Sequence, residues 1–401
     1  MNKLTIEQLA SSGELSSKRV LVRVDFNVPM DKEVEGRIAD DKRIIESLPT
    51  IMKIMKEDGK CILMSHLGRP KGEPNMKYSL RPVAGHLARL LNKPVFFADD
   101  CAGPDTAMAA DDLKSGEVLL LENLRFHKEE EANDDNFSKH LAAYGDVYVN
   151  DAFGTAHRAH ASTVGVTKYI SRCAAGYLME KELNYLSKII NEYEHPFVAI
   201  LGGSKISGKI DVIKNLLPKA DKILIGGGMM FTFYKAMGKE IGNSLLEEDK
   251  IDLARELVKY GGSKLVLPVD VVVVDKVEND AASAIVNADK ITAGKIGVDI
   301  GPKTIEIFRK EILKARTVFW NGPMGVFEMD SFAKGTFEVA ESLAAVTSGG
   351  AVTVIGGGDS AAAIAKAGLD KKVSHVSTGG GASLEFVEGR KLPGVEALTD
   401  V

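Results

Sequence analysis

Residues 351–368, AVTVIGGGDSAAAIAKAG, combine a short run rich in Val, three consecutive glycines and an Ala-rich segment. This order predicts a buried strand, a tight turn and a helix. Gly356–Gly358 lack side chains, so a ligand can approach the backbone where the first N–H groups of the helix are unpaired. Such an end favours a phosphate. The alternative is an ordinary connection in which Asp359 caps the helix and Ser360 follows it.

The same alternation of strand and helix patterns extends over the whole chain. Helix patterns separate apolar runs that end in polar or glycine residues at 18–29, 60–70, 94–100, 116–123 and 146–154, and a second series follows a helix pattern at 177–192. Such alternation predicts parallel sheets with covered faces. We therefore expect an α/β fold of two Rossmann-like domains, each a mainly parallel sheet with helices on both faces, joined by a hinge helix.

Two local features of this pattern carry further expectations. Pro49 lies inside the helix pattern of residues 41–58 and predicts a break or kink there. Residues 264–274, KLVLPVDVVVV, are rich in Val and Leu and predict a strand.

Overall charge and cysteine usage exclude several classes of protein. The 401 residues include 51 basic and 56 acidic ones, a net charge of −5, so we expect no nucleic-acid partner. Cys61, Cys101 and Cys173 are far apart and show no CxxC spacing, which argues against a disulfide framework or a structural zinc site. The chain shows no apolar export leader and no run near the ~18 apolar residues of a membrane span. We expect a cytoplasmic protein with no membrane partner.

Basic and polar residues collect where the strands of the first half end. Ligands of open parallel sheets bind at the carboxyl ends of the strands, and arginine forks suit a multiply charged oxyanion. A phosphorylated carboxylic acid would fit. Asp151, His157 and His160 also suggest a metal site, although two structural histidines are the favoured interpretation. The candidate residues are Arg23, Asp25, Asn27, Arg43, His66, Arg69, Arg125, His157, Arg158 and His160.

The second half has glycine-rich strand ends instead. Residues 203–209 match G-x-x-x-x-G-K, but Ile210 stands where a P-loop needs Ser or Thr, so we reject that assignment. Lys205 and Lys209, four apart at an expected helix start, would project from one face toward a polyphosphate. Gly226–Gly228 and Gly356–Gly358 strengthen the nucleotide interpretation.

One half suited to an anionic acid and another suited to a nucleotide together favour phosphoryl transfer. This reaction needs placement and cations rather than a covalent nucleophile. A dinucleotide-dependent oxidoreductase is the first alternative, since Gly356, Gly358 and Ala361 match G-x-G-x-x-A. No strand ending in an acid follows about 20 residues later, as the ribose contact would require. The second alternative is a catalytically inactive binding protein.

Eight segments in both halves resemble the phosphoglycerate kinase family, in the order in which that family carries them. They are RVDFNVP at 23–29, MSHLGRP at 64–70, LLLENLRF at 119–126, DAFGTAHRAHAST at 151–163, LGGSKISGK at 201–209, FWNGPMGVFE at 319–328, GGGDS at 356–360 and STGGGASLEFVEG at 377–389. The resemblance implies a monomeric two-domain kinase that transfers a phosphoryl group between 1,3-bisphosphoglycerate and ADP, giving 3-phosphoglycerate and ATP with Mg²⁺. Many members have Thr at the position of Ser360.

The resemblance also implies site residues and their roles. Arg43, Lys205 and Lys209 would be catalytic, and Asp359 would bind magnesium. Glu328 would contact the ribose, and Gly227 and Gly297 the adenosine. The implied phosphoglycerate site comprises Asp25, Phe26, Asn27, Arg43, His66, Leu67, Gly68, Arg69, Arg125 and Arg158. The implied nucleotide site comprises Lys205, Lys209, Gly227, Gly297, Glu328, Gly357, Gly358, Asp359 and Ser360.

The implied domains are residues 1–176 for phosphoglycerate, with the tail 389–401 returning to them, and residues 193–388 for the nucleotide. The helix at 177–192 would join them, and closure about this helix and the STGGG segment would bring the reactants together.

Overall fold

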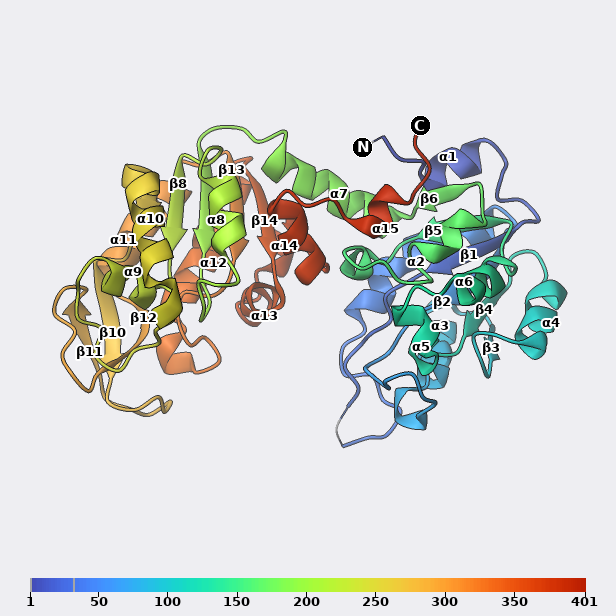
Figure 1. Cartoon of the computed structure of the whole chain (residues 1–401), viewed down its shortest axis with the longest axis horizontal. Coiled ribbons are helices and arrows are strands. Elements are labelled where there is room, and N and C mark those ends of the chain that lie inside the picture. The colour runs from blue at the N-terminus through green and yellow to red at the C-terminus, as the bar shows by residue number, and fades with distance from the viewer. Residues whose placement is uncertain (1, 32) are drawn as a thin grey trace. The chain divides into compact units, whose positions relative to one another are not determined.

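The computed structural model describes residues 2–31 and 33–401 and divides into two compact units. Unit 1 consists of residues 1–184 and 391–401, and unit 2 of residues 185–390. Each contains a six-stranded parallel sheet, and unit 2 adds a three-stranded antiparallel sheet. The expected α/β architecture of two mainly parallel sheets with helices on both faces is confirmed (Figure 1).

The sheet of unit 1 has the order β3-β4-β2-β1-β5-β6. Its central strands are buried on both faces, as Val20, Leu21 and Val22 show with no exposed surface, and this explains their continuous apolar runs. The strands are β1 Arg19–Arg23, β2 Lys60–Met64, β3 Val95–Ala98, β4 Val118–Leu121, β5 Val147–Asn150 and β6 Cys173–Ala175. The α-helices are α1 Ile6–Ser11, α2 Lys42–Lys56, α3 Arg81–Leu91, α4 Pro104–Asp112, α5 Lys128–Glu131, α6 Asp135–Ala142 and α15 Pro393–Glu396.

The two chain ends lie together on unit 1. The Leu4 amide donates to the Thr399 carbonyl (2.8 Å), and Figure 1 shows both ends beside α1. Helix α7, Tyr177–Ile190, begins on unit 1 and crosses the boundary between residues 184 and 185.

Helix α2 is continuous through Pro49, so the break is excluded, and the kink stays a prediction. Pro49 cannot donate a hydrogen bond to the Ile45 carbonyl one turn earlier. Both residues are exposed, so water can solvate that carbonyl and the helix continues.

The parallel sheet of unit 2 has the order β15-β14-β13-β7-β8-β9. Its strands are β7 Phe197–Leu201, β8 Lys222–Ile225, β9 Leu265–Val266, β13 Thr317–Asn321, β14 Val352–Gly356 and β15 His375–Val376. The antiparallel sheet contains β10 Asp270–Val274, β11 Ser283–Asn287 and β12 Ile296–Ile300. The α-helices are α8 Ile210–Leu216, α9 Met230–Ala236, α10 Ile251–Gly261, α11 Pro302–Ile312, α12 Lys334–Ser348, α13 Gly358–Lys366 and α14 Gly381–Val387.

Residues 264–274, expected as one strand, form two strands in different sheets. Strand β9 pairs with β8, and β10 pairs with β11 and β12. Pro268 lies between them and cannot donate to a sheet ladder, which separates the two pairings.

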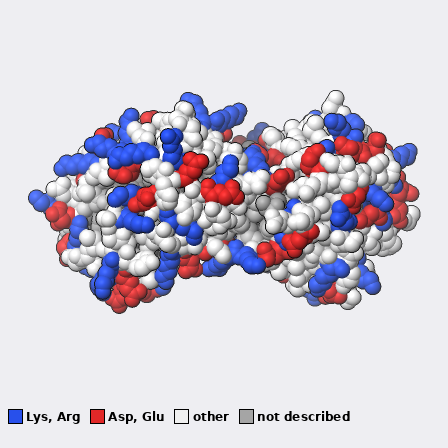
Figure 2. Space-filling model, turned by 90° about the horizontal axis from the view of Figure 1, so that it is seen from above, with Lys and Arg blue, Asp and Glu red and all other residues white. Residues whose placement is uncertain are grey.

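Basic and acidic side chains are interspersed on the face that Figure 2 shows, on both units. Among the described residues, no helix has the length and apolar character that crossing a membrane requires.

Candidate active site

The parallel sheet of unit 1 brings distant loops to one edge. Strands β1, β2, β4 and β5 are adjacent and parallel, so their carboxyl ends lie side by side. Asp25 and Asn27 follow β1, His66 and Gly68 follow β2, and Arg125 follows β4. These predicted residues therefore lie in loops at the carboxyl ends of neighbouring strands.

His66 lies at the centre of this edge and is 3% exposed. Burial lowers its pKa well below 6.5, and the charges of Arg23, Arg125, Arg43 and Arg158 lower it further. The imidazole is therefore neutral at pH 7. The Arg23 Nη2 group lies 3.1 Å from His66 Nδ1, and a guanidinium can only donate. Nδ1 is thus the acceptor, and Nε2 carries the hydrogen that a bound anion can accept.

Arg43 is fixed by the loop that follows β1. Its Nη1 donates to Asp25 Oδ2 (2.8 Å) and to the Asn27 carbonyl (3.3 Å). The Asn27 side chain in turn accepts from the Gly68 amide (2.9 Å). Gly68 has φ +64°, and a Cβ there would overlap the Tyr78 ring. A glycine is therefore needed at this position.

Arg125 is fixed at the same edge. Its Nη1 donates to the Gly68 carbonyl (2.9 Å), and its Nε lies 3.2 Å from Glu131 Oε1. Arg158 is half-buried and acts electrostatically on His66, Arg125 and His160. Arg69 is exposed in the loop that follows His66.

Phe26 and Leu67 are buried side chains, at 0% and 3% exposure. The Phe26 amide donates to Ser65 Oγ (2.8 Å), and the Leu67 amide donates to Asn123 Oδ1 (3.2 Å). These side chains belong to the core, so they shape the edge without presenting polar groups to it. Asn123 is a bracing residue that the sequence pattern did not reveal.

We call the carboxyl-end edge of the unit 1 sheet, with Arg43, His66 and Arg125, the basic edge. A buried chain of hydrogen bonds that begins at Arg23 adjoins it. Arg23 Nε donates to Ser162 Oγ (2.8 Å), and that hydroxyl donates to Glu130 Oε1 (2.6 Å). The Glu130 carboxylate has no exposed surface, and burial raises its pKa, which the Arg23 charge opposes. His160 lies nearby with its pKa lowered to about 4, chiefly by burial. His160 is therefore buried and neutral, and the interpretation of His157 and His160 as structural histidines stays a prediction.

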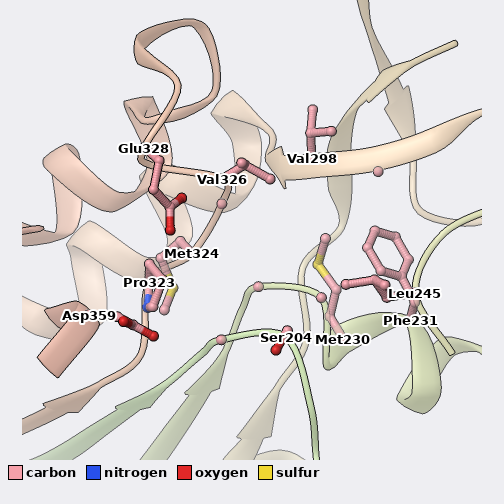
Figure 3. Close-up of a pocket in the computed structure, with 15 residues that line it drawn as sticks. Ser204, Met230, Phe231, Leu245, Val298, Pro323, Met324, Val326, Glu328 and Asp359 are labelled. Atoms are coloured by element: carbon pink, nitrogen blue, oxygen red, sulfur yellow. The ribbon is translucent and has the colours of Figure 1, made fainter. Parts of the chain in front are cut away.

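Unit 2 contains two adjoining cavities of about 250 and 340 Å³. Both are lined by Gly203, Ser204 and Asp359, so they form one continuous surface. In the first cavity, the apolar side chains of Met230, Phe231 and Leu245 lie on one side, and the carboxylates of Glu328 and Asp359 lie on the other (Figure 3). Such a slot suits a flat ring with a polar sugar.

Glycines bring backbone close to backbone around these cavities. Gly227 has φ +65°, and a Cβ there would lie 2.5 Å from the Gly203 amide nitrogen. A Cβ at Gly297 would overlap the Phe231 ring. The second cavity is lined by Lys205, Lys209, Asn321, Gly357, Gly358, Ser360 and the STGGG glycines Gly380 and Gly381, among others.

The segment at 351–368 forms strand β14 and helix α13, as expected. Gly357, with φ +90°, is the N-cap, and Asp359 is the second residue of the helix. The capping alternative for Asp359 is therefore wrong, and its carboxylate lines both cavities. Ser360 is fully buried, and its Oγ accepts from the Gly322 amide (2.6 Å).

Lys205 and Lys209 precede helix α8, which begins at Ile210, so the expectation that both stand on one helical face is wrong. The Ile206 and Ser207 amides donate to Glu247 Oε2 (2.6 and 3.1 Å) and hold this loop away from helical geometry. Both lysines nevertheless line the same cavity.

Lys209 is the more buried of the two lysines. Its Nζ donates to Asn321 Oδ1, and Asn321 Nδ2 donates to the Gly356 carbonyl (2.7 Å). Burial lowers the pKa of Lys209 to about 8, although Asp359 and Glu388 act in the opposite direction. Asn321 was not predicted as a site residue. Its position at the carboxyl end of β13, beside β14, was the available signal.

An Asp359 carboxylate facing two cavities fits a magnesium ion, since Mg²⁺ binds through few carboxylates and keeps several waters.

Comparisons with known proteins identify the family of the chain. The family model described as phosphoglycerate kinase matches residues 10–390. The chain is 60% identical to a phosphoglycerate kinase of Chlorobium phaeobacteroides and 58% identical to one of Chlorobaculum tepidum, with both chains fully covered in each case. The solved phosphoglycerate kinase of Coxiella burnetii matches with a TM-score of 0.88 at 40% identity, and that of Pyrococcus horikoshii with 0.83 at 33%. Each match covers 98% of both chains. The chain belongs to the phosphoglycerate kinase family.

Proposed function

We propose that the basic edge of unit 1 binds phosphoglycerate and that the paired cavities of unit 2 bind the nucleotide. The reaction is that of the family, the reversible transfer of a phosphoryl group from 1,3-bisphosphoglycerate to ADP, giving 3-phosphoglycerate and ATP. The assignment of the sites rests on the different chemical lining of the two surfaces. One edge gathers arginines around a neutral histidine, and the other surface joins an apolar slot to a glycine-walled, lysine-lined cavity.

On unit 1, the arginines supply planar donor forks for the carboxylate and the phosphate of the substrate. The His66 Nε2–H group donates one further hydrogen bond. Asp25 and Asn27 set the position of Arg43 before substrate arrives, so little ordering is needed on binding. The proposed residues are Asp25, Phe26, Asn27, Arg43, His66, Leu67, Gly68, Arg69, Arg125 and Arg158, with the buried Phe26 and Leu67 shaping the loops that carry the polar groups.

On unit 2, the apolar slot holds the adenine between Gly227 and Gly297, and Glu328 accepts from the ribose hydroxyls. The start of α13 at Gly357–Gly358 directs free N–H groups toward the phosphates, and Lys209 adds a charge. Asp359 and Ser360 stand beside them. Asp359 would hold Mg²⁺, which supplies positive charge to the phosphate oxygens when bound.

Transfer itself needs cations on the moving group rather than a covalent step through the protein. Arg43 and Lys205 are the proposed partners of the group in transit, with Lys209 on the nucleotide side. We propose that closure about α7 and the STGGG segment brings the two ligands in line and excludes water. Small-angle scattering with and without both substrates tests closure, and an unchanged radius of gyration would count against it.

A coupled assay with 3-phosphoglycerate, ATP and Mg²⁺, reading ADP production, tests the function. We expect turnover that is lost when either substrate is withheld. Turnover without 3-phosphoglycerate would contradict the assignment, and no turnover at all would favour an inactive relative. Replacing ATP by a nicotinamide dinucleotide should give no reaction, which tests the oxidoreductase alternative.

We also propose that the chain acts as a cytoplasmic monomer. Cys61, Cys101 and Cys173 are free and buried, which fits a reducing compartment. Size-exclusion chromatography with light scattering measures the mass, and a dimer would contradict this proposal.

A further inference from the structure

Asp100, Cys101 and His127 form a group of side chains that are not among the residues assigned to either candidate substrate site. One carboxylate oxygen, the Cys101 sulfur and one ring nitrogen all lie within 4.8 Å of one another. Asp100 and Cys101 lie in the loop between β3 and α4, and His127 immediately precedes α5. We propose that these three residues bind a divalent transition-metal ion of borderline softness, such as Zn²⁺.

The geometry of the three side chains is already constrained. His127 Nε2 lies 2.6 Å from Asp100 Oδ1, and the imidazole stacks on the Phe137 ring with centroids 5.2 Å apart. The Cys101 amide donates to the same carboxylate oxygen (2.6 Å) and fixes it relative to the sulfur. Zinc–ligand bonds of about 2.0–2.3 Å place tetrahedral ligands roughly 3–4 Å apart, so only small side-chain movements are needed.

The ligand types select the class of metal. A thiolate, an imidazole and a carboxylate form a set that zinc and similar ions accept, whereas Mg²⁺ prefers oxygen ligands alone. The thiolate and the carboxylate together carry two negative charges, which a divalent cation neutralises. Cys101 has no exposed surface, so its thiol is protonated in the absence of a metal and releases that proton as the ion binds.

Two of the three proposed ligands, Asp100 and His127, are accessible to ions from solvent, whereas Cys101 is fully buried. Asp100 and His127 line a cavity of about 760 Å³, and their side chains are 52% and 29% exposed. The cavity therefore offers an entry path, and it leaves a fourth coordination position for water, as in zinc sites that are not purely structural. Carboxylates on the cavity wall favour cations, and two lysines oppose them. These groups are Glu73, Asp99, Glu122, Glu129, Lys71 and Lys128.

The alternative is a plain His127–Asp100 ion pair beside a core cysteine. Cobalt spectroscopy separates the two, because only a bound thiolate gives a sulfur-to-cobalt charge-transfer band. The full-length protein, first treated with a chelator, is titrated with Co²⁺ and then with Zn²⁺. We expect one equivalent of Co²⁺ to produce the band and Zn²⁺ to remove it, with excess Mg²⁺ having no effect.

Matched variants locate the site. C101S should lose the band, and H127Q and D100N should bind Co²⁺ at least roughly tenfold more weakly. C173S is the matched control, because Cys173 is also buried and donates to the Ile170 carbonyl (3.0 Å), a bond that serine can keep. D359N should keep the band, which separates this site from a magnesium–nucleotide site.

A Co²⁺ titration without the charge-transfer band would overturn the proposal, as would a band that survives in C101S. If C101S does not fold, as judged by circular dichroism, H127Q and D100N decide the matter, since their positions are partly exposed. Unchanged Co²⁺ affinity in both would overturn the proposal.

Discussion

Nucleotide binding should become weaker at alkaline pH because of Lys209. Burial lowers the pKa of this lysine to about 8 in the free protein. Only the charged form attracts phosphate, and a bound polyphosphate raises the pKa in turn. The protonated fraction falls from about nine-tenths at pH 7 to about one-tenth at pH 9. Affinity for ATP should therefore fall about tenfold over this interval, provided that the bound lysine stays charged.

Isothermal titration of ATP into the protein at pH 7, 8 and 9 measures this effect. At pH 8, comparing two buffers of different ionisation enthalpy should show uptake of about half a proton per nucleotide. The nucleotide phosphates titrate themselves, so the decisive quantity is the ratio of wild-type affinity to that of K209R, whose guanidinium stays charged.

Lys205 provides the matched control, because it is exposed in the same cavity. K205R should keep the pH dependence of the wild type, and K209R should lose it. The reasoning is refuted if K209R and the wild type show the same dependence, or if no proton is taken up at pH 8.

Three further predictions concern other residues. K205A should lower turnover far more than ATP affinity, because the proposed contact forms with the group in transit. Steady-state kinetics beside direct binding measure both, and equal losses would contradict the catalytic role. The pKa of Asp151 is raised to about 6 from 3.8, chiefly by burial. The folded protein thus holds this proton more tightly than the unfolded chain does. The free energy of unfolding of the wild type should therefore fall by at most about 3 kcal/mol as the pH rises from 4 to 6. Urea unfolding at pH 4 and 7 measures this, and D151N should lack the loss. If the wild type and D151N lost the same free energy of unfolding between the two pH values, Asp151 would not be its source. G297A would overlap Phe231 and should weaken ATP binding while leaving phosphoglycerate binding unchanged. Titration with each ligand checks this, and equal weakening would indicate general unfolding.

Periodicity predicted the parallel sheets because each buried strand needs a continuous apolar run, and β1, β2 and β4 have one. It did not predict the antiparallel sheet of β10, β11 and β12. Strand β11 is largely exposed, so its sequence lacks the apolar run of a core strand. The break at Pro49 and the single strand across Pro268 were also mispredicted, because whether a proline interrupts an element depends on the solvent exposure and pairing of its neighbours.

The strand-end rule placed His66, Arg125 and the glycine clusters at sheet edges, since parallel strands must end at a common edge. Residues that act through others were not predictable in this way. Ser162 accepts from Arg23, Glu130 accepts in turn from Ser162, and Asn321 accepts from Lys209. Ser162 and Asn321 lie inside segments that resemble the family, but no pattern in the sequence indicated that they hold other side chains in place. The Asp100–Cys101–His127 cluster was missed for the same reason, because its members come from two loops with no metal-binding spacing.

The two candidate sites offset the energetic cost of their positive charges in different ways. Arginine cannot release its proton at any physiological pH, so unit 1 relieves repulsion with carboxylates and a neutral ring. Asp25 pairs with Arg43, Glu131 pairs with Arg125, and burial among arginines keeps His66 neutral. Unit 2 buries Lys209, and burial lowers its pKa to about 8. This lysine can therefore lose its charge by releasing a proton near neutral pH. Sensitivity to pH between 7 and 9 should therefore belong to the nucleotide site, because the basic edge of unit 1 holds its charge state throughout that range.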